Sequence, residues 1–532
     1  NVALLLAGKL GKRPQEVAVE IADELKKNTI FTKVNIAGPG FINMWVEQNF
    51  YTTICQELVN NLDDYLKEEL NLESNKKTMV IDTSHPNIAK PMGVHHLLST
   101  IIGDSIKKIY LRMSHEVIND NYLGDWGTQF GKLIYAIRTW GDEKIIEKDP
   151  IPELLKLYVK FHDESENNPE LDEFGRKEFK KLEEGGESNR KLWKFIVEKS
   201  MEEFQKIYKR LNVDFDVING ESFYEDRMPA ILEYGRKKEI FVDGEKGAWI
   251  VMPEDPRDPP AVIRKSDGAT LYITRDLARI KYWEETWHPD LMVNVVDVAQ
   301  EFYFRQLFDA ADKLKFTNAR NTHVKFGRMD FKDVKMSTRK GNIIKLKKVL
   351  DEAEERSLKL IQERGAELSN DEQKELARIM GIGSVKYNIL HQNRIQNITF
   401  DWDRMLSLEG NSAPYLMYTI ARAKSILRKA DVNLSDTAKY ELNLSDNAET
   451  NVALDLLTYQ DALKRAADEF KPNHIANFLY QLAQNFNTFY NALPVLKADE
   501  DVKKSRLLLI GAVITVMEDA FGLLGMEVPE KM

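Results

Sequence analysis

The fold is decided by the segment Pro86-Asn87-Ile88-Ala89-Lys90-Pro91-Met92-Gly93-Val94-His95-His96-Leu97-Leu98-Ser99-Thr100. A short apolar run at 79–82 precedes it, and residues 101–110 continue it with the apolar spacing of a helix. The sequence therefore predicts a strand, a tight loop that contains proline and glycine, and a helix with two histidines in its first turn. In an open α/β sheet a nucleotide binds in the crevice at this position, where the helix N-terminus offers free N–H groups to phosphate.

A second segment, Lys335-Met336-Ser337-Thr338-Arg339-Lys340-Gly341, carries mobile positive charge. The chain contains no Gly-x4-Gly-Lys-Ser/Thr sequence, so this segment is not a P-loop. Lys335 and Arg339, with backbone N–H groups near Ser337, can neutralise the charge that builds on a triphosphate attacked at its α-phosphorus. Alone, the segment also fits an exposed basic turn; its pairing with the first segment favours a nucleotide site.

The two segments resemble the two ATP-binding signatures of class I aminoacyl-tRNA synthetases. Within the first, Pro-Asn-Ile-Ala-Lys-Pro at 86–91 resembles the arginyl-tRNA synthetase family. The resemblance implies an α/β fold with a Rossmann-type parallel sheet that carries insertions. It implies catalytic roles for Lys90, His96, Lys335, Ser337 and Arg339. It implies ATP binding by Gly93, His95, His96, Lys335, Met336 and Ser337.

The first segment departs from the family's usual form, which is His-x-Gly-His followed by Leu-Arg-Ser-Thr. Gly93 replaces the first histidine, His95 replaces the glycine, and Leu98 replaces the arginine, whereas His96 keeps the second histidine. The family's glycine leaves room for adenine against the backbone, and a side chain at His95 occupies that room. Either His95 turns outward and supplies the imidazole that Gly93 lacks, or ATP binds differently or poorly.

Polar residues accompany several predicted strands. A strand at 116–121 contains Glu116 and Asn121, and a β-branched run at 291–298, expected to be buried on both faces of a parallel sheet, ends shortly before Gln300. Tyr272 and Asp276 are four residues apart, on one face if the chain turns helical after Thr274. By themselves, Glu116 and Asn121 also fit surface residues before a turn, and Asp276 fits a charge at a helix N-terminus.

These residue types suit a guanidinium ligand. A guanidinium presents five N–H donors in a planar fork, which carboxylate and amide oxygens match best. The resemblance implies that the arginine substrate is bound by Asn87, Glu116, Asn121, Tyr272, Asp276 and Gln300.

The pattern divides the chain into four regions. Residues 1–73 are expected to form a small α+β domain and a connector helix, and Ala-Gly-Pro-Gly-Phe-Ile-Asn at 37–43 resembles the family's N-terminal domain, which contacts the outer corner of tRNA. Residues 74–345 are expected to form the catalytic domain, with a helical insertion at about 140–211. A helical connecting region at 346–409 precedes 410–532, which resembles an all-α anticodon-binding domain.

Some local expectations are specific enough to test. Val2, Leu5, Leu6 and Leu10 are expected to share one apolar helix face, and residues 271–273 to form a short strand. In the C-terminal region, Tyr490 is a candidate for stacking on anticodon bases, while Phe486 and Phe489 are expected in the core. A basic cluster there fits a solvated helix face when considered alone; it comprises Arg422, Lys424, Arg428 and Lys429.

The bulk composition sets limits on these interpretations. The net charge of −10 argues weakly against a polyanionic partner, but binding depends on local clusters rather than on the sum. Cys55 is the only cysteine, which rules out an intramolecular disulfide or a cysteine-based zinc site. We expect no membrane span, no secretory signal and a cytoplasmic location. Because the chain begins at Asn1 within an apolar helical pattern, we expect the N-terminal domain to be truncated at its start.

The resemblance implies ATP-dependent activation of L-arginine to arginyl-adenylate and its transfer to the 3′ end of tRNA(Arg). It further implies a monomer that needs bound tRNA for activation, with Mg²⁺ accompanying ATP and no metal ligand set of its own. The altered first segment supports an alternative, a non-catalytic synthetase-like protein that binds tRNA or arginine, but the second segment argues against it. A synthetase for glutamate or cysteine is disfavoured, because Glu116 and Asp276 suit a cationic side chain.

Overall fold

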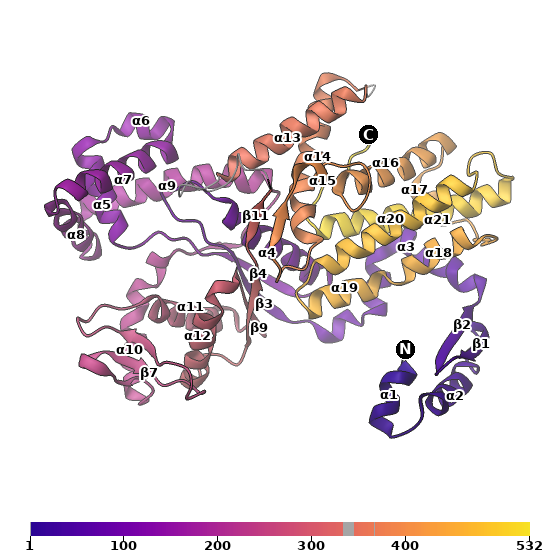
Figure 1. Cartoon of the computed structure of the whole chain (residues 1–532), viewed down its shortest axis with the longest axis horizontal. Helices are drawn as coiled ribbons and strands as arrows, with labels where there is room; N and C mark the ends of the chain where they lie inside the picture. The colour runs from indigo at the N-terminus through magenta and orange to yellow at the C-terminus, as the bar shows by residue number, and fades with distance from the viewer. Residues whose placement is uncertain (1, 333–344, 366–367) are drawn as a thin grey trace.

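The centre of the molecule is a five-stranded parallel sheet in the order β10-β9-β3-β4-β5 (Figure 1). The computed structural model describes residues 2–332, 345–365 and 368–532. The strands are β3 (Thr78–Ser84), β4 (Glu116–Asn121), β5 (Val217–Ile218), β9 (Leu291–Asp297) and β10 (Arg320–Phe326). From β3 the chain continues to β4 on one side, while β9 pairs with β3 on the other. The strand order therefore reverses between β3 and β9, where open α/β sheets bind their ligands.

Both faces of the sheet are buried, as the apolar runs predict. Alternate residues of β3 enter different cores: Met79 and Ile81 pack with the apolar side of α4 (Val94–Arg112), and Val80 packs with α11 (Tyr272–Trp287) and α12 (Glu301–Leu314). The same alternation holds in β9, where Met292 and Val293 are both fully buried. Helices on both faces fix the strands, and α4 begins at the carboxyl edge of β3.

Five helices follow β4 and form one end of the molecule (Figure 1). They are α5 (Thr128–Trp140), α6 (Glu143–Lys148), α7 (Pro150–Asn167), α8 (Glu170–Glu183) and α9 (Glu187–Arg210). The chain then returns to the sheet through β5, η2 (Glu221–Arg227) and α10 (Met228–Lys237). A small antiparallel sheet follows, made of β6 (Val242–Asp243), β7 (Trp249–Val251) and β8 (Ala261–Arg264).

The strand predicted at 271–273 is wrong. Leu271 is extended and precedes α11, whose first residues are Tyr272 and Ile273. The helix forms because Ile273, Leu277 and Ile280 bury one helical face, and the Thr274 hydroxyl donates a 2.6 Å hydrogen bond to the Ile263 carbonyl.

The N-terminal module lies at the edge of the molecule and joins it through α3 (Gln48–Glu69) (Figure 1). It contains α1 (Val2–Leu10), α2 (Pro14–Leu25) and a hairpin of β1 (Phe31–Ala37) and β2 (Phe41–Val46). The predicted apolar face of α1 is wrong, because Val2, Leu5 and Leu10 are exposed. The helix instead buries its small residues Ala3 and Ala7 against Val17, so that α1 and α2 approach closely.

The C-terminal half is almost entirely helical and lies on the other side of the sheet from the insertion (Figure 1). Its first elements are β11 (Met329–Phe331), α13 (Leu346–Glu363), α14 (Asn370–Leu390), β12 (Ile398–Phe400) and α15 (Trp402–Met405). The remaining helices are α16 (Ala413–Ala430), α17 (Leu434–Thr437), α18 (Asn447–Leu457), α19 (Tyr459–Asp468), α20 (Asn473–Ala492) and α21 (Glu500–Leu523). Phe486 and Phe489 are fully buried in this bundle, as predicted. Across the described ranges, no helix combines the length and apolarity that crossing a bilayer requires.

Candidate active site

A cavity of about 600 Å³ opens at the carboxyl edge of β3 and β9, where the strand order reverses. Six of the predicted site residues line it, contributed by the β3–α4 loop, α4, α11 and the segment after β9. They are Asn87, His95, His96, Tyr272, Asp276 and Gln300. Residues separated by more than 200 positions in the chain therefore share one cavity.

The two histidines stand at the N-terminus of α4 with their ring centroids 3.9 Å apart. The Gly93 N–H donates a 3.1 Å hydrogen bond to Nδ1 of His96, so the ring proton of neutral His96 resides on Nε2. Burial, together with the neighbouring His95 and His85, lowers the pKa of His96 to about 3. At neutral pH, His96 is thus uncharged and offers its Nε2–H as a donor. It lies in the first turn of α4, whose N-terminus is at the cavity.

A buried network of charges forms the opposite wall. Arg279 is almost fully buried; it forms an ion pair with Asp82 and donates a 2.8 Å hydrogen bond to Asn294 Oδ1. Asp276 accepts a hydrogen bond from the Tyr303 hydroxyl through Oδ2. Its other oxygen, Oδ1, is buried and accepts no hydrogen bond from the residues described; Arg279 Nε lies 3.6 Å away. Asp276 lines the cavity, so this acceptor without a partner belongs to the wall that a ligand donor would approach.

Glu221 also lines the cavity, and sequence reasoning missed it as a site residue. It lies at the start of η2 and forms a 3.3 Å ion pair with Arg275, whose guanidinium also contacts Glu225 at 2.6 Å. Burial, with the nearby carboxylates Asp125 and Asp276, raises the pKa of Glu221 to about 7 against the opposing effect of Arg275. The available sequence signal was a carboxylate directly after Gly220, in a turn near the carboxyl end of β5.

The charge balance of this wall favours a cationic ligand. The cavity lining contains four carboxylates, Asp82, Glu221, Asp276 and Asp297, and one guanidinium, Arg279. Asp82 also contacts His85 at 2.7 Å, and Arg275, behind the lining, pairs with Glu221. When all four carboxylates are ionised, an additional cation is needed to compensate them in a partly desolvated space. A guanidinium meets this need and can donate several hydrogen bonds at once.

Glu116 and Asn121, which the resemblance assigns to the arginine site, do not line the cavity. Glu116 is the first residue of the strand, is exposed and pairs with Thr78 at the amino edge of the sheet. Asn121 ends the strand but is fully buried, and its amide donates a 3.1 Å hydrogen bond to the Tyr208 hydroxyl rather than lining the cavity. The strand direction causes the difference, because only one end of a parallel strand can reach the ligand edge.

The other predicted residues fall into three groups. Lys90 does not line the cavity; its ammonium lies 4.9 Å from the ring centroid of Tyr158 in α7. Gly93 supports the site through its N–H bond to His96. The remaining predicted residues, Lys335, Met336, Ser337 and Arg339, lie outside the described residues.

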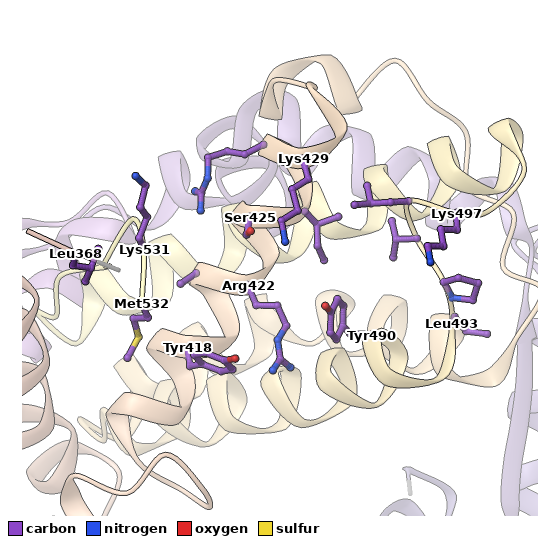
Figure 2. Close-up of a pocket in the computed structure, with 16 residues that line it drawn as sticks. Leu368, Tyr418, Arg422, Ser425, Lys429, Tyr490, Leu493, Lys497, Lys531 and Met532 are labelled. Carbon is purple, nitrogen blue, oxygen red and sulfur yellow. The ribbon is translucent and has the colours of Figure 1, made fainter. Parts of the chain in front are cut away.

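A second cavity, of about 640 Å³, lies in the C-terminal helical bundle (Figure 2). The Arg422 guanidinium on α16 stands between two exposed rings, with its carbon 4.7 Å from the centroid of Tyr418 and 4.8 Å from that of Tyr490. Among the described residues that line the cavity, five are cationic and none is acidic: Arg422, Arg428, Lys429, Lys497 and Lys531. Lys424, from the same predicted basic cluster, instead pairs with Glu518 and Glu530.

The chain has the class I synthetase fold, with a central parallel sheet and a helical C-terminal domain. Residues 58–402 match the family model of the class I (R) tRNA synthetase catalytic domain. Residues 1–46 match the arginyl tRNA synthetase N terminal domain, and residues 416–532 match the DALR anticodon binding domain. The chain belongs to the arginyl-tRNA synthetase family.

Individual relatives agree with this assignment over nearly the whole chain. An arginine–tRNA ligase from Fusobacterium nucleatum subsp. nucleatum is 40% identical over 100% of this chain and 92% of its own length. The arginyl-tRNA synthetase structure from Plasmodium falciparum has a TM-score of 0.84 and 27% identity, and covers 100% of this chain and 92% of that chain. The Thermus thermophilus arginyl-tRNA synthetase, 24% identical with a TM-score of 0.82, covers 99% of this chain and 93% of that chain and shows the shared fold.

Proposed function

We propose that this chain ligates L-arginine to the 3′ end of tRNA(Arg) at the expense of ATP, through an arginyl-adenylate. The proposal is carried by one observation: carboxylates Asp276 and Glu221 line the same cavity as a neutral imidazole at a helix N-terminus. The two carboxylates suit a guanidinium, and the imidazole at the helix N-terminus suits phosphate. Family membership supports the same reaction.

In this mechanism the arginine side chain lies between Asp276 and Glu221. Asp276 Oδ1 accepts from the guanidinium, and Tyr303 holds the carboxylate in place through Oδ2. Tyr272, Gln300 and Asn87 line the same cavity and form hydrogen bonds with the remaining polar groups of the substrate. Arg279 and Asp82 form a buried ion pair with each other, so we assign them to the wall rather than to ligand binding.

The arginine carboxylate attacks the α-phosphorus of ATP, which forms arginyl-adenylate and releases pyrophosphate. The terminal ribose hydroxyl of tRNA then attacks the arginyl carbonyl and displaces AMP. Neither step needs a side-chain nucleophile, so catalysis depends on positioning and on stabilisation of developing charge. His96 Nε2–H and the N-terminus of α4 are the proposed donors to phosphate, together with Lys335, Met336, Ser337 and Arg339. Mg²⁺ is proposed to accompany ATP, held mainly by phosphate oxygens and water.

His95 is proposed to provide a second imidazole to the nucleotide. Its ring packs on His96 and lines the cavity. It therefore lies at the N-terminus of α4, the place proposed for the ATP phosphates. This placement favours the first of the alternatives that the altered segment left open, namely that His95 supplies the imidazole missing at Gly93.

The C-terminal cavity is proposed to hold an unpaired base of the tRNA anticodon. Tyr418 and Tyr490 offer ring faces, Arg422 offers a planar cation, and the surrounding lysines suit the phosphate backbone.

Family membership is the basis on which we propose the domain limits 1–73, 74–345, 346–409 and 410–532, a monomeric state and a cytoplasmic location. The comparisons give no support to a non-catalytic synthetase-like protein.

The decisive test is arginine-dependent exchange of pyrophosphate into ATP. The chain is expected to catalyse this exchange when arginine and tRNA(Arg) are both present, and to transfer arginine to tRNA(Arg) in a charging assay. Lysine, glutamate and cysteine, each added in place of arginine, are the controls and are expected to give no exchange. Absence of exchange with arginine and tRNA(Arg), while ATP still binds in calorimetry, would refute the proposed function.

Replacing Arg422 with alanine is expected to lower kcat/KM for tRNA(Arg) about tenfold. Stacking of a base on an aromatic or guanidinium plane contributes about 1–3 kcal/mol, and the variant removes the group between the two tyrosine rings. Arg465→Ala, an exposed arginine on α19, is the matched control and is expected to leave kcat/KM unchanged. Equal losses in both variants would show that only general positive charge matters.

The affinity for arginine is expected to rise about tenfold between pH 6 and pH 8. Burial raises the pKa of Glu221 to about 7 in the free site. The substrate guanidinium stays protonated and needs the ionised carboxylate, so binding below this pKa must first remove a proton. Affinity therefore falls below pH 7 and levels off above it. Calorimetric titration of Glu221→Gln, in parallel with the unmodified chain, is expected to show weak binding with no pH dependence in this range.

A further inference from the structure

Four helices from separate parts of the chain meet around the buried ammonium group of Lys386 on α14. Its Nζ donates hydrogen bonds to the carbonyl of Leu211, which ends α9, and at 2.5 Å to the carbonyl of Gly525, just after α21. On α4, Asp104 is buried and pairs with Lys108 at 2.5 Å, while Ser105 donates a 2.8 Å bond to the Leu523 carbonyl. The Ser105 hydrogen bond thus joins α4, the helix that carries His95 and His96, directly to the end of α21.

The chemistry of this junction explains why a lysine is buried there. The carboxyl ends of α9 and α21 both present unpaired carbonyls, which carry partial negative charge. Asp104 adds a carboxylate whose Oδ1 has no hydrogen-bond partner among the described residues. Burial lowers the pKa of Lys386 to about 8, opposed by Asp104 and Glu527 and reinforced by Lys108. Lys386 therefore compensates the carbonyls of two helix ends, and Asp104, which pairs with Lys108, adds negative charge nearby.

Gly525 fits this junction closely. Its φ of +63° favours glycine, and a Cβ there would lie 2.9 Å from both Asp104 Oδ2 and Lys386 Nζ. The chain cannot carry a side chain at this position without displacing one of those groups. Gly525 therefore lies close against the charged groups of α4 and α14.

The last eight residues, 525–532, which we call the C-terminal strap, lead from this junction to the C-terminal cavity. Glu527 forms a two-bond ion pair with Arg378 on α14, at 2.8 and 2.6 Å. Glu530 pairs at 2.5 Å with Lys424 on α16, the helix that also carries Tyr418 and Arg422. Lys531 and Met532 then line the same cavity as Arg422, on the side where Leu368 lies (Figure 2). The end of α21, through Leu523, and the strap that follows it therefore connect α4 with the proposed base-binding cavity.

We propose that Lys386 is a positioning residue that links occupation of the C-terminal cavity to the placement of α4 at the active site. The link runs from Met532 and Lys531 through the C-terminal strap to Gly525, whose carbonyl accepts the Lys386 hydrogen bond. From there it reaches α4 through the Ser105–Leu523 hydrogen bond and through the attraction between the Lys386 ammonium and Asp104. This inference rests on the proposed function. A base bound in the cavity fixes the end of the strap, and the arrangement of α4 compatible with that strap position is then favoured. Binding at one site can influence the other only through such a difference in affinity between two arrangements.

The test is a double-mutant cycle between Lys386→Met and Arg422→Ala, measured as kcat and KM in charging of tRNA(Arg). Lys386→Met is expected to lower kcat about tenfold with an unchanged KM for tRNA, within the range typical of coupling between sites. In the Arg422→Ala background the cavity no longer engages the base, so Lys386→Met is expected to add less than about a threefold loss. Lys374→Met, an exposed lysine on the same helix, is the matched control and is expected to leave both constants unchanged.

The outcomes separate clearly. Losses that multiply in the double variant, or a KM effect equal to the kcat effect, would overturn the inference, because they indicate independent or purely structural roles. If thermal unfolding shows that Lys386→Met destabilises the chain, Glu527→Gln replaces it in the cycle, since this ion pair is partly exposed. The same non-additivity is then expected, and multiplying losses again overturn the link. Absence of charging by the unmodified chain would instead refute the proposed function.

Discussion

Replacing Asp276 with asparagine is expected to lower kcat/KM for arginine by about 30- to 1,000-fold. The carboxylate lines the cavity, is held by Tyr303 through Oδ2, and its Oδ1 accepts no hydrogen bond from the described residues. Removing one partner of a desolvated, hydrogen-bonded charge pair costs about 2–4 kcal/mol, much of it from the charge left without a counterpart. The measurement is pyrophosphate exchange as a function of arginine concentration, with tRNA(Arg) saturating.

Glu116→Gln provides the matched control for this prediction. Both residues are carboxylates that sequence reasoning placed in the arginine site, but Glu116 lies at the amino edge of β4 and is exposed. Its substitution is expected to leave kcat/KM for arginine unchanged. A large loss in Glu116→Gln together with normal activity in Asp276→Asn would contradict the arrangement of the site described above.

Replacing His96 with alanine is expected to lower kcat of adenylate formation by about 100- to 1,000-fold. His96 is neutral, with its pKa lowered to about 3 by burial, and its Nδ1 is engaged by the Gly93 N–H. The Nε2–H is therefore a fixed donor, and removing one preorganised donor to developing charge typically has an effect of about this size. Because His96 stays uncharged above pH 5, its contribution is expected to be independent of pH between 6 and 8.

The His95→Ala variant tests whether the two imidazoles share this role. His95 is exposed and lacks a hydrogen bond that fixes its ring among the described residues, so its removal is expected to reduce kcat only about tenfold. Calorimetry with a non-hydrolysable ATP analogue distinguishes binding from catalysis in both variants. Tighter nucleotide binding in His95→Ala would indicate that the ring obstructs the adenine site rather than contacting phosphate.

The sequence was most informative where a local pattern has a single structural solution. The β-branched run of β9 predicts a strand buried on both faces, and its residues do enter both cores of the sheet. The proline- and glycine-containing loop before α4 predicts a strand-to-helix turn, and the histidines lie in the first turn of that helix. Tyr272 and Asp276 are four residues apart, which predicted that they share one helix face, and both lie on α11 and line the cavity.

Sequence reasoning failed where the outcome depended on strand direction and on side chains from distant elements. Glu116 and Asn121 are five residues apart on one strand, which separates them by about 16 Å along its axis. Only the carboxyl end of β4 approaches the ligand edge, and even there Asn121 turns into the core toward Tyr208. The acid that reaches the cavity is Glu221, whose position depends on the return of the chain through β5 and η2.

The amino-acid sequence by itself therefore determined the family, the strand–loop–helix at the nucleotide site and the helical C-terminal half, because each follows from local periodicity or a contiguous motif. Only the tertiary structure decided which carboxylates face one another, how Lys386 joins α4 to the C-terminal strap, and where Arg422 meets two tyrosine rings. These arrangements depend on the packing of separate helices and strands, and distance in space between such elements is not encoded in the spacing of residues along the chain.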